Sequence, residues 1–552
     1  MTSVRELADR YHAEWLDAHP FVASEKGIAG RNDRLPDDSQ AGDARRRQQI
    51  EAVLAEGRLL AGAELSPADS VTLGAVLSAG EQELDGLASA AVEYTVTPMP
   101  FAGPASLLAV AARTVLRDEQ AAGDYLTRLR RSGAWIDQLS ERLGIGAAKG
   151  RLPVAPLVEA ALGWADVVLA QPVPEAFTAP RPPGGWDGAD AWRSARDEAV
   201  RDVVRPALGR WVDRLRALLP DARPAERPGL VHLPGGDADY ARAIRVHTTL
   251  PLTAEELHRI GQEEVDRLEE RCRQLGTELG LGDLAAVYAA MRASSAAADP
   301  RRAMAAAVEA VRRAESRAAE VFPDPLPPPC EVTPMPPVVA ASGMAPHYTA
   351  PRLDGGRPGT YWFNTERPTA GAGWDVEGVA FHETVPGHHL QLSRILLLDH
   401  LPAFQRERGV TVFSEGWGLY AEQLAEEMGL YSDTRALLGA MANALMRGAR
   451  LVVDTGMHAL GWSRAQALRY FTDHVPMPEP FLANEIDRYI IMPGQALAYL
   501  TGKLELLRLR EQAQRSLGDG FTLPAFHAAV LDQGSLPLPM LRRSLEFWTA
   551  GD

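Results

Sequence analysis

The amino-acid sequence predicts a mainly α-helical protein, and three observations support this prediction. Apolar residues recur at positions i, i+3, i+4 and i+7 along most of the chain, which is the spacing of an amphipathic helix. Ala, Leu, Arg and Glu, which favour helices, are abundant, and runs of β-branched residues are few. Helix-start patterns also occur, with Ser66 before a proline and capping boxes that begin at Thr253 and Ser463.

The predicted elements follow in chain order. Helices that serve as a scaffold are expected at 5–18, 43–61, 67–88, 118–143, 254–279 and 300–320. Proline-rich segments at 172–186, 220–235 and 323–337 predict loops, because proline lacks a backbone N–H and cannot continue a helix.

Strand character is concentrated after the third proline-rich segment. Val338-Val339 and the segment Gly359–Thr365 (GTYWFNT) are rich in residues that suit a half-buried sheet surface, so a short hairpin or edge strand is predicted. Such a strand could bind an extended substrate through its backbone, with Tyr361 at the contact. The chain is therefore divided into a helical scaffold region, 1–340, and a region that contains the chemistry, 341–552, within one continuous structural unit.

Length and composition restrict the class of protein. With 552 residues, 46% hydrophobic and 24% charged, the chain has the composition of a soluble globular protein rather than a collagen-like or disordered one. Lys and Arg number 57 against 73 Asp and Glu, and the net charge of −16 repels phosphates and anionic lipids, so neither nucleic acid nor a membrane is expected as a partner. Cys272 and Cys330 predict neither a disulfide framework nor a cysteine metal site.

The location predicted for the protein is the cytoplasm. The N-terminal segment is charged and amphipathic, without the apolar core of a secretory signal. No stretch approaches the run of about 18 apolar residues that a membrane helix needs.

The densest group of metal-ligating residues is Phe381–Gln391 (FHETVPGHHLQ). His382 and Glu383 followed by a second histidine are typical of zinc hydrolases, in which two imidazoles bind Zn²⁺ and the glutamate polarises the metal-bound water. The usual second histidine lies four residues on, about 40° around the helix, whereas proline occupies that position here. A kink at Pro386-Gly387 would return His388 to His382. His389 is the alternative ligand, although it would lie about 10 Å along a straight helix.

Glu415, in the segment SEGWGLYAE, is the predicted third ligand, 27 residues after His388. Gly416 and Gly418 would let its helix approach the histidine helix closely. Three protein ligands leave a coordination position open, as in a catalytic rather than a structural zinc site. One zinc ion is therefore expected, with Glu383 as general base. The alternative is that the histidines fill a core and Glu415 is a surface acid. However, three histidines and a glutamate beside Pro-Gly are not expected in an apolar core.

A second polar group contains Arg450, Asp454 and His458, which recur every four residues on one helix face. Asp454 could orient a ligand imidazole, and His458 could donate to a substrate carbonyl or oxyanion. The alternative is a buried ion pair that braces two helices.

A third polar group follows Arg488, where Gln495, Tyr499 and Lys503 would share one face of a helix that begins near Pro493. These donors could hold the C-terminal carboxylate and amide of a peptide. The alternative is an ordinary exposed helix face.

Five motifs in order, between 357 and 502, resemble those of the bacterial family catalogued as domain of unknown function 885: RPGTYWFNT, HETVPGHHLQ, SEGWGLYAE, RLVVDTGMHALGWS and RYIIMPGQALAYLTG. The resemblance implies zinc dependence and the helical, channel-bearing architecture of gluzincin peptidases, which include angiotensin-converting enzyme and thermostable carboxypeptidases. It also implies that Tyr489 stabilises the tetrahedral intermediate. Many gluzincins place an acid four residues after the glutamate ligand, where this chain has Leu419, so Asp454 or Glu422 would orient the histidine instead.

The sequence thus predicts a zinc-dependent metallohydrolase that acts on short peptides, as an exopeptidase of the carboxypeptidase or dipeptidase type or as an oligopeptidase. Glu383 would be the general base, and Tyr489 or His458 the oxyanion donor. One alternative is a metal-dependent amidase or C–N lyase with the same ligands. The other is a non-catalytic helical binding protein with a structural metal, which would need a fourth ligand such as His389.

Overall fold

The computed structural model describes residues 3–336, 340, 345–366 and 373–551. It confirms the mainly α fold, because helices make up most of these residues and the only sheet among them has three short strands. All six predicted scaffold segments are helical, and the capping boxes at Thr253 and Ser463 are present. The first two proline-rich segments are mostly loop with short turns of helix inside them. The third is loop up to Cys330, but Glu331–Pro334 form a strand, so the loop prediction is wrong there, and residue 337 lies outside the described residues.

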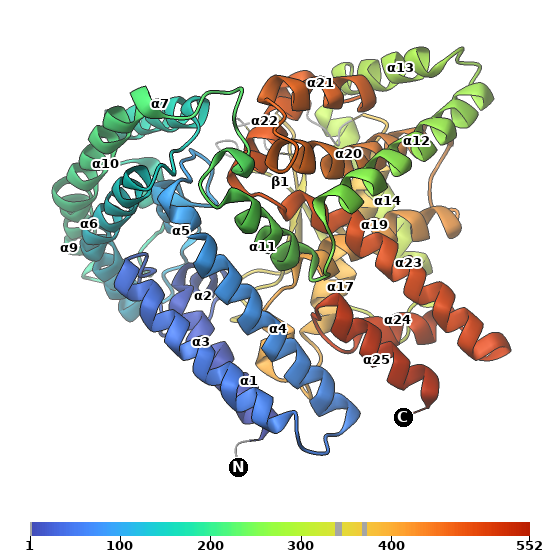
Figure 1. Cartoon of the computed structure of the whole chain (residues 1–552), viewed down its shortest axis with the longest axis horizontal. Coiled ribbons are helices and arrows are strands. Elements are labelled where there is room, and N and C mark those ends of the chain that lie inside the picture. Colours follow the sequence, from blue (N-terminus) through green and yellow to red (C-terminus); the bar gives the residue numbers. More distant parts are fainter. Residues whose placement is uncertain (1–2, 337–339, 341–344, 367–372, 552) are drawn as a thin grey trace.

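Residues 4–218 form two helical groups on the left of Figure 1. The lower group contains α1 (Val4–Ala18), α2 (Pro20–Lys26), α3 (Gln40–Leu60) and α4 (Pro67–Ser89). The outer group has its own apolar core around Trp135, Trp192 and Trp211. It consists of α5 (Gly103–Arg113), α6 (Glu119–Ala148), α7 (Ala155–Ala170), α8 (Glu175–Thr178), α9 (Ala189–Ala199) and α10 (Arg205–Leu218), with a π-helical turn (Val200–Val204) that joins α9 to α10.

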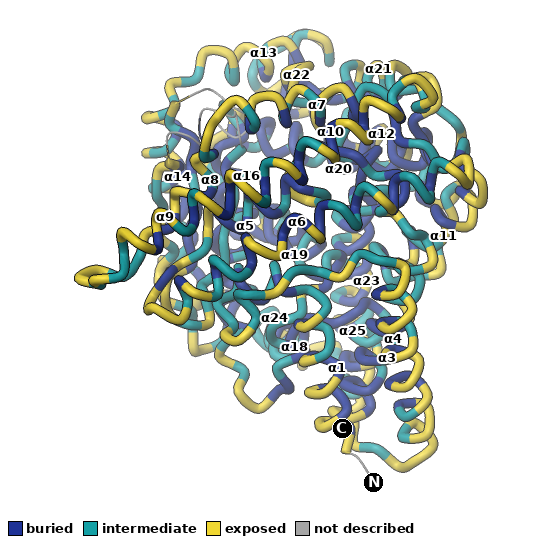
Figure 2. Tube along the Cα trace, turned by 90° about the vertical axis from the view of Figure 1, so that its left-hand side faces the viewer, coloured by how far each residue is buried: buried dark blue, intermediate teal, exposed yellow. Residues whose placement is uncertain are grey.

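The remaining helices form the right side of Figure 1. They are α11 (Gly236–Thr248), α12 (Ala254–Glu278), α13 (Leu284–Ala296), α14 (Pro300–Arg317), α16 (Val376–Glu383), α17 (His388–Ile395), α18 (Ala403–Glu407), α19 (Thr411–Glu427), α20 (Thr434–His458), α21 (Arg464–His474), α22 (Glu479–Ile491), α23 (Ala498–Leu517), α24 (Leu523–Leu531) and α25 (Leu538–Ala550). Short 3₁₀ turns cover Ala91–Glu93, Leu219–Asp221, Leu230–His232, Ala318–Glu320, Gln495–Leu497 and Gly518–Gly520. The peripheral helices alternate buried and exposed residues, as their amphipathic sequences predict (Figure 2).

The largest apolar core joins the two ends of the chain. Leu7 and Tyr11 of α1 and Val76 of α4 belong to the same cluster as Phe381 of α16 and Trp417 of α19. Both described ends of the chain lie at the same end of the molecule (Figures 1 and 2). The helices around the histidine motif are therefore supported by residues more than three hundred positions away in the sequence.

Helix α20 passes through the interior and packs along α12. A methyl group at Gly261 of α12 would lie 2.7 Å from Cβ of Leu451 and 2.9 Å from the Gly448 carbonyl oxygen, so glycine permits this close packing. Contrary to the sequence prediction, α20 is long and apolar enough to cross a membrane by length and composition, with a mean hydropathy of 1.3, alone among the described helices. However, 83% of that apolar window is buried inside the protein, as in a core helix.

The small sheet has the strand order β1-β3-β2, with β1 (Glu331–Pro334) parallel and β2 (His347–Thr349) antiparallel to β3 (Thr360–Phe363). The predicted strand in GTYWFNT is confirmed, but it is the central strand and not an edge. Tyr361 pairs with Val332 on one side and Tyr348 on the other, and its side chain is fully buried. The proposed substrate contact at Tyr361 is therefore wrong. Val338-Val339, the other predicted strand residues, lie outside the described residues.

Candidate metal centre

The histidine motif is built on two short helices with a turn between them. Helix α16 ends at Glu383 and α17 begins at His388, so the helix is interrupted at Pro386-Gly387 as the sequence predicts. The indole N–H of Trp417 donates to the Pro386 carbonyl oxygen at 2.9 Å and holds the turn. A side chain at Gly387 would place its Cβ 1.9 Å from the His382 carbonyl oxygen, so only glycine fits.

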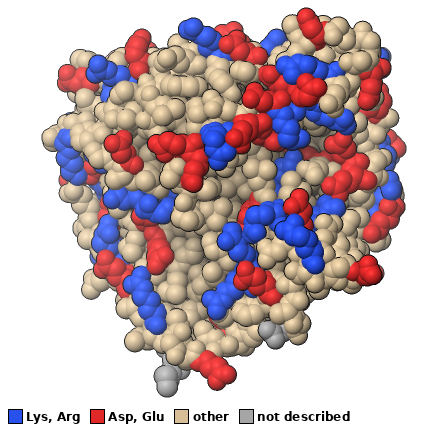
Figure 3. Space-filling view, turned by 45° about the vertical axis from the view of Figure 1, so that its right-hand side comes forward, with Lys and Arg blue, Asp and Glu red and all other residues tan. Residues whose placement is uncertain are grey.

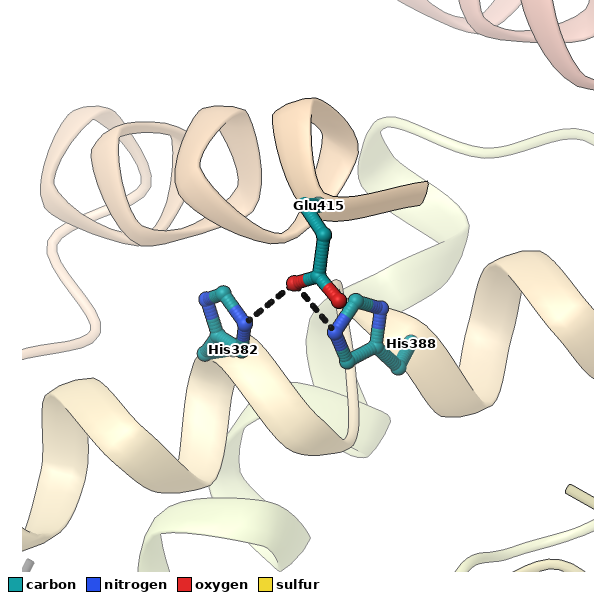
Figure 4. Close-up of side chains that lie close together, drawn as sticks. All are labelled: His382, His388 and Glu415. Carbon is teal, nitrogen blue, oxygen red and sulfur yellow. Dashed lines mark ion pairs between the residues drawn. The ribbon is translucent and has the colours of Figure 1, made fainter. Parts of the chain in front are cut away.

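The turn brings His382, His388 and Glu415 together (Figure 4). Nε2 of His382 and Nε2 of His388 lie 3.8 and 3.6 Å from the same Glu415 oxygen, and the three ligand atoms are all within 4.8 Å of one another. These distances are close to the separation of about 3.3 Å expected between ligands of one tetrahedral zinc ion with bonds of 2.0–2.1 Å. Two imidazoles and a carboxylate are also a donor set that zinc accepts. The three residues therefore fit the predicted ion.

Glu415 reaches the histidines because α19 packs closely on α16. A Cβ at Gly418 would lie 2.5 Å from Cε1 of His382, so the glycine leaves room for the imidazole. Gly416 has a different neighbour, since its Cβ would lie 2.5 Å from Cα of Gly502 in α23. Of the two glycines expected at the histidine helix, only Gly418 contacts it, and Gly416 lets α19 and α23 approach.

Glu422 orients the first histidine. Nδ1 of His382 donates to the Glu422 carboxylate at 2.8 Å, which leaves Nε2 free to bind a metal. Asp454, the other predicted partner, accepts hydrogen bonds from the Tyr240 hydroxyl at 2.6 Å and from the Gly494 N–H at 3.1 Å, and not from His382. The choice that the sequence left open is thus decided for Glu422.

Charges at the centre favour a cation. Burial lowers the pKa of His382, but the Glu415 and Glu422 carboxylates outweigh it and raise this pKa to about 9. Burial would raise the pKa of Glu415, but His382 and His388 hold it well below its usual range.

Glu383 lies beside the three ligands on the wall of the same cavity. Its carboxylate accepts a hydrogen bond from the backbone N–H of Tyr348 in β2 at 2.8 Å, so the strand restrains the predicted base. The sequence analysis missed Tyr348, because three residues of strand carry too short a pattern to be recognised.

His389 supports this strand and is not part of the three-residue cluster. Its Nε2 donates to the Pro328 carbonyl oxygen at 2.7 Å, and its Nδ1 accepts from the Tyr348 hydroxyl at 3.0 Å. Both ring nitrogens are engaged, so His389 is neither the second ligand nor a fourth one.

A cavity of about 630 Å³ connects the candidate metal centre to the polar residues of α20 and α22. The predicted residues on its wall are His382, Glu383, His388, Glu415, Arg450, Arg488, Gln495 and Tyr499. Gln495 accepts from Arg488 at 2.6 Å, and the Arg450 guanidinium lies 4.3 Å from the centre of the Tyr499 ring. The wall therefore combines metal ligands, a carboxylate base and a group of cationic donors.

Besides Tyr361, three residues that were predicted to contact the substrate do not reach this wall. The Tyr489 hydroxyl is buried, donates to Glu485 at 2.6 Å and accepts from Arg450 at 2.8 Å. His458 accepts from the Leu230 N–H and donates to the Tyr489 carbonyl, both at 3.1 Å, and burial lowers its pKa to about 3. Neither is placed to act as an oxyanion donor, because the polar atoms of both side chains are engaged by protein groups and neither residue lines the cavity.

Lys503 is the third residue away from the wall. It is half-buried on α23, where burial lowers its pKa against the attraction of Glu264 and Glu422. The predicted carboxylate grip of Gln495, Tyr499 and Lys503 is therefore wrong for Lys503.

The wall residues that the sequence analysis missed include Gln391 of α17 and Asn443 and Arg447 of α20. Gln391 follows His388 by three residues, its side chain is fully buried, and neither amide atom has a partner among the described residues. Asn443 and Arg447 share a helix face with Arg450, which is a spacing that could have revealed them.

The fold and the site define a class, a mainly α-helical protein with a His-His-Glu cluster on the wall of a cavity. Residues 20–545 match the family described as "Bacterial protein of unknown function (DUF885)", and the chain belongs to this family. No curated protein sequence matches the chain.

Two solved structures are similar along the whole chain. The crystal structure of the "putative lipoprotein" from Colwellia psychrerythraea is 24% identical, with a TM-score of 0.90 and 100% of each chain covered. The structure of a "putative lipoprotein of unknown function" from Shewanella oneidensis is 16% identical, with a TM-score of 0.72, and covers 98% of this chain and 99% of its own. These likenesses show that the three proteins share a fold.

Proposed function

We propose that the protein is a zinc-dependent metallohydrolase that acts on short peptides as an exopeptidase or oligopeptidase. The convergence of His382, His388 and Glu415 beside Glu383, on the wall of one cavity, is the observation that supports it. Three protein ligands leave one zinc position open, as catalytic sites require. A cavity of about 630 Å³ is in the range of sites that bind small molecules.

When bound, zinc supplies the Lewis acidity that lowers the pKa of water and polarises a carbonyl group. Glu383 accepts the proton of the attacking water and gives it to the leaving nitrogen. The Tyr348 N–H keeps the Glu383 carboxylate in one position, and Glu422 fixes the tautomer of His382.

Tyr499 replaces Tyr489 and His458 as the proposed oxyanion donor. It lies on the cavity wall, whereas the other two are buried elsewhere. Burial and the nearby Glu415 carboxylate raise the pKa of Tyr499, so its phenol stays protonated and able to donate.

Two alternative functions would use the candidate metal ligands but differ in which other residues they need. An amidase or C–N lyase would use the three ligands without needing the cationic wall of α20 and α22. A binding protein with a structural metal needs a fourth ligand. Because both nitrogens of His389 are engaged elsewhere, that residue does not complete such a site.

The first experiment measures the metal content of the purified protein together with amino-acid release from a mixed dipeptide and tripeptide library. One equivalent of zinc, and cleavage that disappears in Glu383→Gln, would support the peptidase. Zinc without cleavage would favour the other enzyme classes. A protein that binds no metal would contradict the proposal.

The partners and the location of the protein remain predictions. Acidic and basic side chains are interspersed over the face shown in Figure 3, and the net charge of −16 still argues against nucleic acid and anionic membranes as partners. The cytoplasmic location is tested by cell fractionation.

A further inference from the structure

We propose that Asn443, Arg447 and Arg450 of α20 form a carboxylate-binding subsite on the wall of the cavity. The proposal deepens the proposed function, since the carboxylate would belong to the peptide. The cavity that these residues line is the one that contains Glu383 and the three candidate metal ligands. One small peptide can therefore contact the subsite and the candidate metal centre together.

The three residues share one face of α20, because they lie four and three positions apart. Their side chains are buried among protein atoms, with exposed fractions of 3%, 8% and 5%. Arg447 donates to the Asn443 side-chain oxygen at 2.9 Å, which aligns the amide with the guanidinium. The set lies within the buried part of α20.

Each of the three side chains has a buried donor without an acceptor. Nδ2 of Asn443, Nε of Arg447 and Nη1 of Arg450 have no partner within the described part of the chain. A buried N–H group that lacks a partner destabilises the fold, and more so when it is charged, so native proteins seldom leave three together. Three neighbouring donors without acceptors indicate the place of a ligand with acceptor oxygens.

The charges identify that ligand as an anion. Arg447 forms no ion pair with any described residue, although it contributes to the lowered pKa of Glu422. Arg450 and Arg488 share the single carboxylate of Glu485, with N···O distances of 2.8 and 2.9 Å. Guanidinium groups do not lose their protons in proteins, so positive charge remains uncompensated on this wall. A planar guanidinium and an amide match the two oxygens of a carboxylate.

A peptide offers such a carboxylate at its C-terminus or on an Asp or Glu side chain. The two sources are separated by binding to the Glu383→Gln protein, in which turnover is removed. The probes are trialanine as the free acid, trialanine amide, and the amide of Ala-Glu-Ala with a blocked C-terminus. Isothermal calorimetry measures Kd for each probe, and circular dichroism checks that each variant is folded.

The free acid is expected to bind at least about tenfold more tightly than trialanine amide, the effect of one charge-assisted hydrogen-bonded pair. If the subsite reads an acidic side chain, the Ala-Glu-Ala amide regains that affinity. Arg447→Gln should remove the preference. Asn443→Asp should do the same, because it keeps the oxygen that Arg447 donates to and adds a negative charge.

Arg435→Gln is the matched control, since it removes one positive charge from the same helix at an exposed position that does not line the cavity. It should change Kd by less than about twofold, because long-range charge effects are screened. The proposal is overturned if no probe binds, if neither trialanine nor the Ala-Glu-Ala amide binds more tightly than trialanine amide, or if Arg435→Gln removes the preference while Asn443→Asp does not. Failure of the proposed function has a separate readout, because these binding ratios need neither zinc nor cleavage.

Discussion

Two pairs of a histidine and an acid, His382 with Glu422 and His458 with Asp454, have different surroundings in the structure. His382 gives one nitrogen to Glu422 and keeps the other free beside His388 and Glu415. His458 uses both nitrogens on backbone groups and lies away from the cavity. A histidine is available for chemistry only where one nitrogen stays free and lies next to a cavity.

The two acids differ in the same way. The His382 imidazole and Arg447 help to hold the pKa of Glu422 below its usual value, although burial opposes them. Asp454 has only neutral hydrogen-bond donors, Tyr240 and Gly494, and burial raises its pKa to about 7. Burial acts on both acids. It is outweighed at Glu422 by groups that include His382 and Arg447, whereas at Asp454 the two hydrogen bonds and the positive charge of Arg488 only partly offset it.

The largest expected effect separates chemistry from metal binding. Glu383→Gln should lower kcat by at least about a thousandfold, because it removes the proton acceptor. Zinc content, measured by atomic absorption, should stay the same because Glu383 is not a ligand. Loss of zinc in this variant would show that Glu383 has been assigned the wrong role.

A direct comparison of the two histidines should give the next largest effect. His388→Ala should lose zinc at micromolar free metal, whereas His458→Ala should keep it. The His458 variant should instead lose about 2–4 kcal/mol of unfolding free energy, because a buried side chain with two hydrogen bonds is removed. Zinc titration and urea denaturation distinguish the two outcomes. Zinc loss in both variants would contradict the prediction that His388 is a zinc ligand and His458 is not.

The two acids provide a finer comparison. Glu422→Gln should weaken zinc affinity about 10–100-fold, the usual cost of changing the group that orients a histidine ligand. Asp454→Asn, the matched change in the other pair, should leave zinc affinity within about twofold. Competition with a chelator of known affinity measures both values, and equal weakening would contradict the assignment of Glu422 alone.

The smallest effect, measured over one pH unit, is a pH dependence of stability. Asp454 has a folded pKa raised to about 7 from 3.8, so between these values the folded state retains a proton that the unfolded state has lost. Its contribution to stability therefore falls as pH rises through this window, by at most about 1.4 kcal/mol for each pH unit. Asp454→Asn removes the group whose protonation differs between the folded and unfolded states. The stability of the variant relative to wild type should therefore increase as the pH rises from 4 to 7. Urea denaturation at several pH values measures this difference, and a constant difference would contradict the raised pKa.

Local sequence was sufficient for features that depend on neighbouring residues. Helix periodicity and caps predicted the scaffold helices, and Pro386-Gly387 predicted the interruption that brings His388 back to His382. The ligands were recognisable because two histidines, a glutamate and a later glutamate have few uses together outside a metal site. The role of Glu422 remained open, because its contact with His382 spans forty residues.

The sequence by itself determined the mainly α class, the positions of the long helices and the residue types of the candidate metal centre, because these follow from periodicity and from the chemistry of side chains. Only the tertiary structure decided which polar residues line the cavity. It buried Tyr489 and His458, left Lys503 off the wall, linked Glu383 to Tyr348, and brought Asn443 and Arg447 to the wall. Burial and the use of each donor depend on helices that are distant in sequence and pack together only in the folded chain.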